Sequence, residues 1–166
     1  MAIVRNADGV TVRLGVDEGT SVKYGEYNVL GPQHVSEHKL EFGDMAAFSV
    51  TKIHSNEVFI PKGARIERVQ VIVEKAFVGA SATLTLGLIQ EDRTTLTGLS
   101  ATGLVNAAAV ATLVQGAVLD LVVGATAVGA LVGVLAPQAV NGLLTSLAGT
   151  ATFTAGIAKI RVFYSF

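Results

Sequence analysis

The sequence predicts an all-β fold, a jelly-roll-like β-sandwich that follows an extended N-terminal arm. Several short segments alternate between apolar and polar residues with a period of two, which is the period of a strand. These segments recur roughly every 8–12 residues and are separated by turns with glycine or proline, as in β-sandwiches and barrels. The strongest lie near the two ends of residues 46–166, and a jelly roll pairs early strands with late ones. We therefore expect an arm over residues 1–45 and one sandwich domain over residues 46–166.

The composition narrows the classes of protein to which the chain can belong. Hydrophobic residues make up 51% of the chain and charged residues 15%, so we expect most of it to be folded. The net charge of −1 gives no basic footprint for nucleic acid, and the absence of cysteine excludes disulfides and thiolate chemistry. No apolar run opens the sequence, so we expect no secretory signal.

The first 45 residues are rich in glycine and polar residues, which indicates an arm without a core of its own. Asp8-Gly9 and Glu18-Gly19 are turn signals. Between them, Thr11–Val16 alternates and predicts a short strand.

The clearest strand signal is Ala64–Phe77, in which valines recur at every second residue, whereas a helix needs apolar residues three or four apart. This segment follows a predicted turn at Ile60–Gly63, with proline second and glycine fourth. Ala46–His54 and Ala82–Gln90 alternate in the same way. Because only a short turn separates Ala64–Phe77 from Ala82–Gln90, we expect these two strands to form a hairpin.

The second half of the chain gives less uniform signals. Asn106–Gln115 is rich in alanine, and both a short helix and a strand fit it. From Gly116 onward we expect two or three short strands with glycine turns. Gly142–Ala148 predicts a further strand, and Ile157–Phe166 predicts a strong terminal strand with its charged residues on one face.

Charge is distributed very unevenly along the sequence. From Thr94 to Ala158 the only charged residue is Asp120, and no aromatic residue lies between Phe77 and Phe153. The surface of a solvated monomer carries far more charge than this. We therefore expect other subunits, a partner surface or lipid to cover this half.

The uncharged stretch Leu121–Val140 tests the lipid alternative. Its length is close to the roughly 20 apolar residues of a membrane span, and Gly129 to Gly133 form the helix-pairing pattern G-x-x-x-G. However, Pro137-Gln138 interrupts the stretch, no Lys, Arg, Trp or Tyr flanks it, and its glycines disfavour a helix. We expect short buried strands and tight loops here, and no membrane partner.

The stretch His34–His38, HVSEH, matches H-x-x-E-H, which on a helix is the signature of inverted zinc proteases. Such a site needs both histidines on one helical face, a third ligand, for which Glu41 and His54 are candidates, and the glutamate as base. Pro32 and Gly43 leave little room for a helix, and few apolar residues would anchor one. We therefore expect a solvated turn or short helix, at most with incidental metal capture.

Other catalytic signatures are missing from the sequence. Gly98–Gly103 only approximates G-x-S-x-G, and no histidine follows His54 to complete a triad. Glycine motifs for phosphates or dinucleotides do not occur, and carboxylates are scarce after Asp92. We predict that the protein is not an enzyme and has no catalytic residue, cofactor or resident metal.

Partner contacts are expected to involve the arm. Tyr24 and Tyr27 could stack on a sugar or base, but as arm residues we expect them to anchor the arm to a neighbouring molecule. With Arg13, His34 and His38, they are the residues through which we expect the chain to bind a partner.

Two segments, roughly residues 57–90 and 149–166, resemble a family of bacteriophage virion proteins. The first has the family's turn, alternating strand and glycine-ended strand, carried by Ile60-Pro61, Gly63-Ala64, Ile66, Ala76-Phe77 and Ala82–Gly87. The second, TFTAGIAKIRVFYSF, is similar to the family's strand after TAGK and its aromatic tail, although Ile157 and Ala158 precede the lysine.

The resemblance implies a capsid cement or decoration protein on the capsid surface of the virion, with a jelly-roll-like sandwich and often trimeric. Such a protein would clamp neighbouring major capsid subunits and stabilise the head. The uncharged half then suits a homotrimer interface, and the arm suits a reach across neighbouring subunits. The alternative is a carbohydrate-binding or adhesive sandwich module of a phage tail or fibre.

Overall fold

The computed structural model describes residues 2–5, 11–14, 33–45, 51–90, 100–135 and 138–166. The chain divides into two compact units, Met1–Leu30 and Gly31–Phe166. In the first unit, β1 (Ala2–Arg5) and β2 (Thr11–Leu14) form an antiparallel pair. The short strand expected within residues 11–16 is therefore confirmed.

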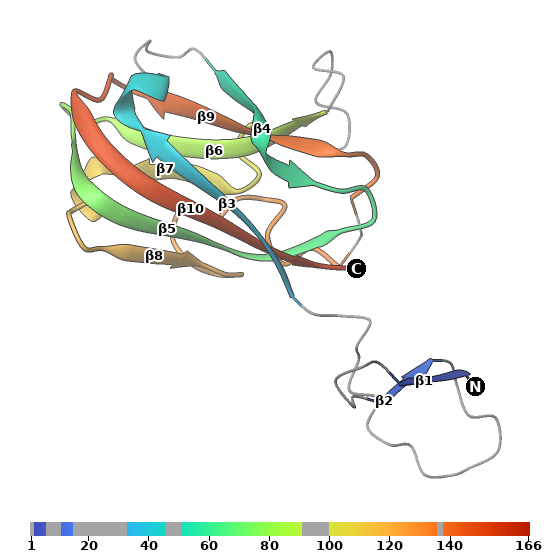
Figure 1. The fold of residues 1–166 in the computed structure, drawn as a ribbon. Coiled ribbons are helices and arrows are strands. Elements are labelled where there is room, and N and C mark those ends of the chain that lie inside the picture. Colours follow the sequence, from blue (N-terminus) through green and yellow to red (C-terminus); the bar gives the residue numbers. More distant parts are fainter. Residues whose placement is uncertain (1, 6–10, 15–32, 46–50, 91–99, 136–137) are drawn as a thin grey trace. The chain divides into compact units, whose positions relative to one another are not determined.

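The described residues of the second unit form eight strands (Figure 1). In chain order they are β3 (His34–Glu41), β4 (Lys52–Ile60), β5 (Arg65–Val78), β6 (Thr83–Gln90), β7 (Val105–Ala109), β8 (Val118–Leu121), β9 (Gly142–Gly149) and β10 (Ala155–Ser165). Two short 3-10 helices, η1 (Phe42–Met45) and η2 (Val110–Thr112), follow β3 and β7.

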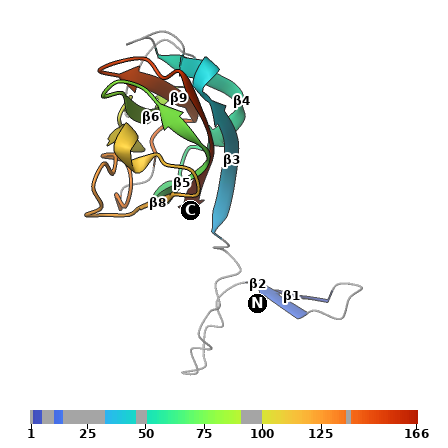
Figure 2. The same cartoon turned by 90° about the vertical axis from the view of Figure 1, so that its left-hand side faces the viewer.

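The eight strands form two four-stranded antiparallel sheets that pack face to face (Figures 1 and 2). The first sheet has the order β3-β10-β5-β8, and the second has the order β4-β9-β6-β7. Early strands thus lie beside late ones, β3 beside β10 and β4 beside β9. Among the described strands of these two sheets, only β6 and β7 are both consecutive in the chain and adjacent in a sheet. This is the connectivity of a jelly roll, so the predicted all-β sandwich is confirmed.

The first sheet includes residues that the sequence placed in the arm. β3 pairs with β10 along its length, with His34 opposite Tyr164 and Glu41 opposite Ile157. β3 is therefore a strand of the sandwich, although we expected its residues in the arm. This strand was not predicted because both of its faces carry polar side chains. Its sequence therefore does not alternate between apolar and polar residues.

The hairpin expected between residues 64–77 and 82–90 is wrong. β5 and β6 are both strands, but they belong to different sheets. The turn between them crosses from one sheet to the other, with Ser81 in the left-handed region at φ 61°. Alternation identifies a strand and its buried face, but it does not say which strand lies beside it.

Three other expected segments can be compared with the structure, the first of them only in part. Residues 46–50 of the strand expected over Ala46–His54 lie outside the described residues, and β4 begins at Lys52. The alanine-rich segment Asn106–Gln115 is part strand, in β7, and part 3-10 helix, in η2. Gly142–Ala148 is a strand, as predicted.

The core lies between the two sheets and is built by the alternating strands. In β10 the residues Ala158, Ile160 and Val162 are fully buried, while the alternating residues between them are partly exposed. In β6, Leu84 and Leu88 are fully buried from the opposite sheet. Full burial of one such leucine, isoleucine or valine side chain stabilises the fold by about 1.5–3 kcal/mol. The core therefore joins the last strand to strands from much earlier in the chain.

The uncharged segment Leu121–Val140 is not a helix. It contains the last residue of β8 and then a series of turns, with positive φ at Gly124 and Ala127. A Cβ at Gly129 would overlap the backbone of Gly103, so this glycine of the G-x-x-x-G pattern serves a close approach between two loops. Among the residues that the structure describes, no helix is long and apolar enough to cross a membrane.

A close backbone approach over β6 gives the first prediction. Gly87 lies under the segment that begins at Ser100, which is held to β6 by hydrogen bonds from Leu88 N–H to Ser100 O (2.9 Å) and from Leu104 N–H to Leu86 O (3.1 Å). A Cβ at Gly87 would overlap the Ser100 carbonyl. We expect Gly87→Ala to lower the free energy of unfolding by about 3 kcal/mol in urea denaturation, because backbone has to move.

The matched control for this prediction is Gly43→Ala. No atom lies within 4 Å of a Cβ at that position, and its φ is not in the left-handed region. We expect the control to change stability by less than about 0.5 kcal/mol. Equal stability of the two variants would contradict the close approach over β6.

Candidate functional site

The two edges of the sandwich carry different kinds of side chain. One edge is formed by β3 and β4, and the other by β8 and β7, which end the two sheets on the opposite side (Figure 2). We call them the β3–β4 edge and the β7–β8 edge. The first holds two histidines and a carboxylate, whereas the second is almost without charge.

The β7–β8 edge exposes apolar side chains on β8 and on the loops around it. Val123 is 71% exposed and Leu135 is 85% exposed. Four more valines of this region are between 40% and 56% exposed: Val114, Val118, Val122 and Val134. Burial of exposed apolar surface by a partner is favourable, so this edge is the strongest candidate for an interface among the described residues.

The single charged residue of this region is paired within the chain. Asp120 Oδ2 lies 3.6 Å from Arg68 Nη1, and the Arg68 guanidinium lies 4.0 Å from the centre of the Phe163 ring. The cation–π contact and the ion pair hold the arginine over the first sheet. A partner at the β7–β8 edge therefore does not have to provide a counter-charge for Asp120.

Charged residues gather instead on the outer face of the first sheet. The Glu37 carboxylate on β3 lies 2.7 Å from Arg161 Nε and 3.2 Å from Lys159 Nζ, both on β10. The hydrogen bond from Arg161, followed by that from Lys159, lowers the pKa of Glu37 below its ordinary value. A hydrogen bond to Glu41, 3.0 Å away, raises the pKa of Lys39. On this face, the charges of Glu37 and Lys39 are thus matched within the chain.

The HVSEH stretch has a geometry that differs from the zinc-protease pattern. It lies on a strand, β3, and not in the expected turn or short helix, so Glu37 points outward while His34 and His38 share the inward face. Four residues along a strand separate the two histidines by roughly 13 Å, which is too far for one metal ion. Glu37 is engaged by two cations on the opposite face of the sheet. The motif therefore does not form a protease site here.

His34 belongs to an aromatic group at the end of the first sheet. Its ring stacks on Tyr164, with centroids 5.3 Å apart, and meets the edge of Phe166 at 5.5 Å. Phe166 is 58% exposed. Contacts of this kind join the start of β3 to the end of β10, so the aromatic tail packs against the first strand of the sandwich.

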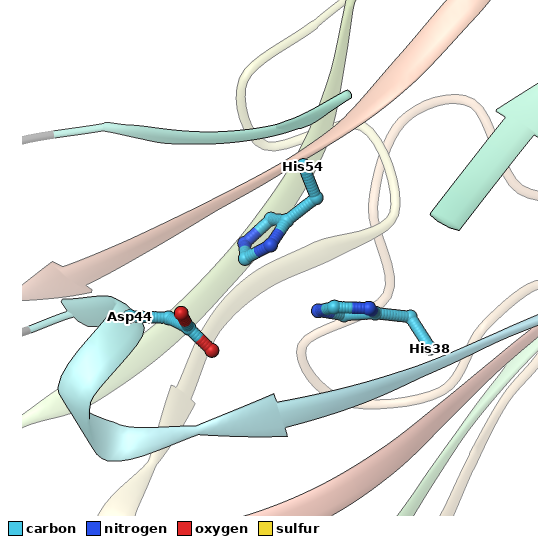
Figure 3. Close-up of side chains that lie close together, drawn as sticks. All are labelled: His38, Asp44 and His54. Carbon is cyan, nitrogen blue, oxygen red and sulfur yellow. The ribbon is translucent and has the colours of Figure 1, made fainter. Parts of the chain in front are cut away.

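His38 belongs to a different group, at the β3–β4 edge. Its ring centroid lies 4.4 Å from that of His54 on β4, and Asp44 on η1 completes the group (Figure 3). His38 is 5% exposed and His54 is 7% exposed, whereas Asp44 is half-buried. The sequence named His54 as a candidate ligand but did not single out Asp44. Glu41, the other candidate, is exposed and pairs with Lys39.

The remaining residues expected to bind a partner lie in the first unit. Arg13 is on β2, opposite Ile3, and nothing is described of its side chain. Tyr24 and Tyr27 lie outside the described residues. Of the five residues expected to bind a partner, the structure describes the side chains of His34 and His38, and these two lie in separate groups.

The strand order defines the class of the protein as a jelly-roll β-sandwich, and comparison with solved structures agrees. The chain is similar to a chain of the capsid asymmetric unit of cyanophage Pam1, with a TM-score of 0.53 at 18% identity. The match covers 93% of this chain and 94% of that one. At this identity the likeness shows a shared fold.

Two more solved structures are similar at lower scores. They are the capsid of Ralstonia phage GP4, with a TM-score of 0.49 at 16% identity over 83% and 86% of the two chains, and the acid-stable capsid of Helicobacter pylori bacteriophage KHP30, with 0.44 at 15% over 81% and 87%. No family model matches the sequence, and no curated protein matches it significantly.

The ion pairs of Glu37 give a prediction about pH. Because its pKa is lowered in the folded protein, the pairs stabilise the fold above the pKa of the unfolded state. This contribution disappears as the pH falls through the folded-state pKa. A carboxyl NMR titration should give Glu37 a pKa below 4.5, the ordinary value, and Arg161→Gln should raise it.

Lys39→Gln is the matched control, because Lys39 pairs with Glu41 on the same strand. We expect it to shift the pKa of Glu37 less than Arg161→Gln does. Equal shifts would mean that general field effects, rather than the contacts of Arg161, set this pKa.

Proposed function

We propose that the protein is a structural virion protein, a homotrimeric cement or decoration protein that clamps neighbouring major capsid subunits and stabilises the head. The observation that carries the proposal is the β7–β8 edge, an exposed apolar surface with one internally paired charge. The likeness in fold to a chain of a phage capsid and the sequence resemblance to virion proteins support the same role.

The β7–β8 edge is assigned to contacts between copies of this chain. The segment from Thr94 to Ala158 carries only Asp120 as a charge, and homo-oligomer interfaces are more apolar than transient ones. If this edge contacts a different patch on the next copy, the copies form a closed ring when the rotation from one copy to the next is a whole fraction of a full turn. A ring of three agrees with the trimeric state that the sequence resemblance implies.

The first unit is assigned to the capsid. Met1–Leu30 is a compact unit separate from the sandwich, so it can contact a major capsid subunit without altering the core. Arg13, Tyr24 and Tyr27 belong to this unit and remain the residues proposed for that contact. The outer face of the first sheet, with Glu37 and Arg161, stays available to solvent at the virion surface.

The oligomer is tested by charges placed on the β7–β8 edge. We expect the wild-type protein to have three times the 17.1 kDa chain mass in gel filtration with light scattering. Val123→Asp and Leu135→Asp should each weaken the assembly about 100-fold, because burying an unpaired carboxylate costs about 3 kcal/mol.

The matched control is Val35→Asp. Val35 is 50% exposed on β3, at the opposite edge of the sandwich. We expect this variant to keep the trimer. A monomeric wild type, or a control that dissociates as readily as Val123→Asp, would refute the proposed interface.

The capsid role is tested on particles. Purified particles should contain the protein, and particles lacking it should lose their genome at a lower temperature. A chain without residues 1–30 should remain a folded trimer but should not bind to capsids. If this deletion binds capsids as well as the full chain, the first unit is not the clamp. Equal heat stability of particles with and without the protein would remove the cement role.

A further inference from the structure

We propose that His38, Asp44 and His54 bind one transition-metal ion of the Zn²⁺ type, which fastens the two sheets together at the β3–β4 edge. This proposal differs from the sequence-based expectation that the protein has no resident metal. The site is independent of the proposed virion role, since all of its donors come from one chain.

Three elements bring the donor atoms together. His38 comes from β3 of the first sheet, Asp44 from η1, and His54 from β4 of the second sheet, and their side chains point toward one another (Figure 3). One ligand atom of each residue lies within 4.8 Å of those of the other two. Donors bound to a tetrahedral zinc ion at about 2.0–2.1 Å are roughly 3.3 Å apart. A shift of about 1.5 Å in the separation of the donor atoms therefore closes the site.

Neighbouring polar groups already orient two of the three ligands. His54 Nε2 lies 2.8 Å from Ser146 Oγ on β9, and Asp44 Oδ2 accepts a hydrogen bond of 3.1 Å from the backbone N–H of Glu41. Metal-binding histidines commonly use their second ring nitrogen for a hydrogen bond of this kind, which fixes the ring and its tautomer. We therefore assign His54 Nδ1 and Asp44 Oδ1 to the metal.

The donor set selects the class of ion. Two imidazoles and one carboxylate suit Zn²⁺ and its neighbours Co²⁺, Ni²⁺ and Cu²⁺, whereas Mg²⁺ and Ca²⁺ prefer oxygen ligands. Three protein ligands leave the fourth tetrahedral position to a water molecule. Because His38 and His54 are more than nine-tenths buried, the ion would lie between the two sheets and not on a freely exposed surface.

A metal ion here would add to a weak connection between the two sheets, because at this edge the Ser36 hydroxyl on β3 donates a long hydrogen bond (3.4 Å) to the Phe59 carbonyl on β4. β3 and β4 are edge strands of different sheets, and each pairs with one strand of its own sheet, β3 with β10 and β4 with β9. Ligands from both edges bridge them through the ion. Since a metal bound only by the folded chain stabilises it, unfolding should require a higher temperature in its presence.

The test uses the full chain after dialysis against a chelator. Titration calorimetry with ZnCl₂ should give one site per chain, and CoCl₂ should give the visible absorption of tetrahedral Co²⁺. With free Zn²⁺ at about 100 times the dissociation constant, we expect the melting temperature to rise by about 5 °C or more, and MgCl₂ should leave it unchanged. His54→Gln should abolish the Co²⁺ spectrum, and Asp44→Asn should weaken binding at least tenfold.

His34→Gln is the matched control, because His34 lies on the same strand but outside the group of ligands. We expect it to bind Zn²⁺ like the wild type. Asp44 is half-buried, so Asp44→Asn keeps the test valid if His54→Gln does not fold. The proposal is overturned if the wild type binds no stoichiometric Zn²⁺, if Asp44→Asn binds as tightly as the wild type, or if His34→Gln loses binding to the same extent as Asp44→Asn.

Discussion

The fold depends on the place of β10 between β3 and β5. This strand forms two ladders at once, and its inward residues Ala158, Ile160 and Val162 are fully buried against the second sheet. Without β10, β3 would lose the only strand with which it pairs in its sheet, and β5 would keep only the short ladder to β8. The ion pairs of Glu37 and the stacking of His34 on Tyr164 both cross the same ladder. Polar and aromatic contacts therefore add to a pairing that the buried aliphatic residues already require.

The second sheet depends on small residues rather than on charge. Gly87 and Gly129 let loop backbones lie directly against neighbouring backbones, where any side chain would overlap them. Such loops use their polar groups for internal hydrogen bonds, as from Leu88 N–H to Ser100 O. The result is an edge that is largely uncharged and rich in exposed valine. The same sequence bias that suggested a membrane span thus builds compact loops and leaves an apolar surface at the β7–β8 edge.

The strands that alternate strongly were predictable from the sequence, and the relations between strands were not. β5 and β10 follow from alternation alone, because one face of each meets the core and the other meets solvent. β3 was assigned to the arm, since His38 takes an inward position that an apolar residue would fill in an ordinary strand. The pairing of β5 with β10 rather than with β6 depends on the whole jelly-roll connectivity, which no local pattern encodes.

The candidate site also depends on relations between strands that the sequence does not reveal. His54 was a named alternative as third ligand, but its proximity to His38 arises only when the edges of two sheets meet. Asp44 was not singled out, because its position depends on the single turn of η1 after β3. His34, which fits the motif by spacing, is removed from the site by the extended conformation of β3. The sequence motif therefore identified His38 correctly as a candidate ligand, and His54 was correctly named as a possible third ligand. The motif was wrong in pairing His38 with His34.

The central position of β10 also has a consequence for the order of events during synthesis. Glu37 and Arg161 face each other across one ladder although 124 positions separate them in the chain. While the ribosome is still translating the middle of the chain, β3 and β5 have emerged without the strand that belongs between them. Folds with such distant pairings form slowly and leave strand edges open to other chains until they close. Nascent copies on one polysome would therefore need protection from pairing with each other until β10 has emerged.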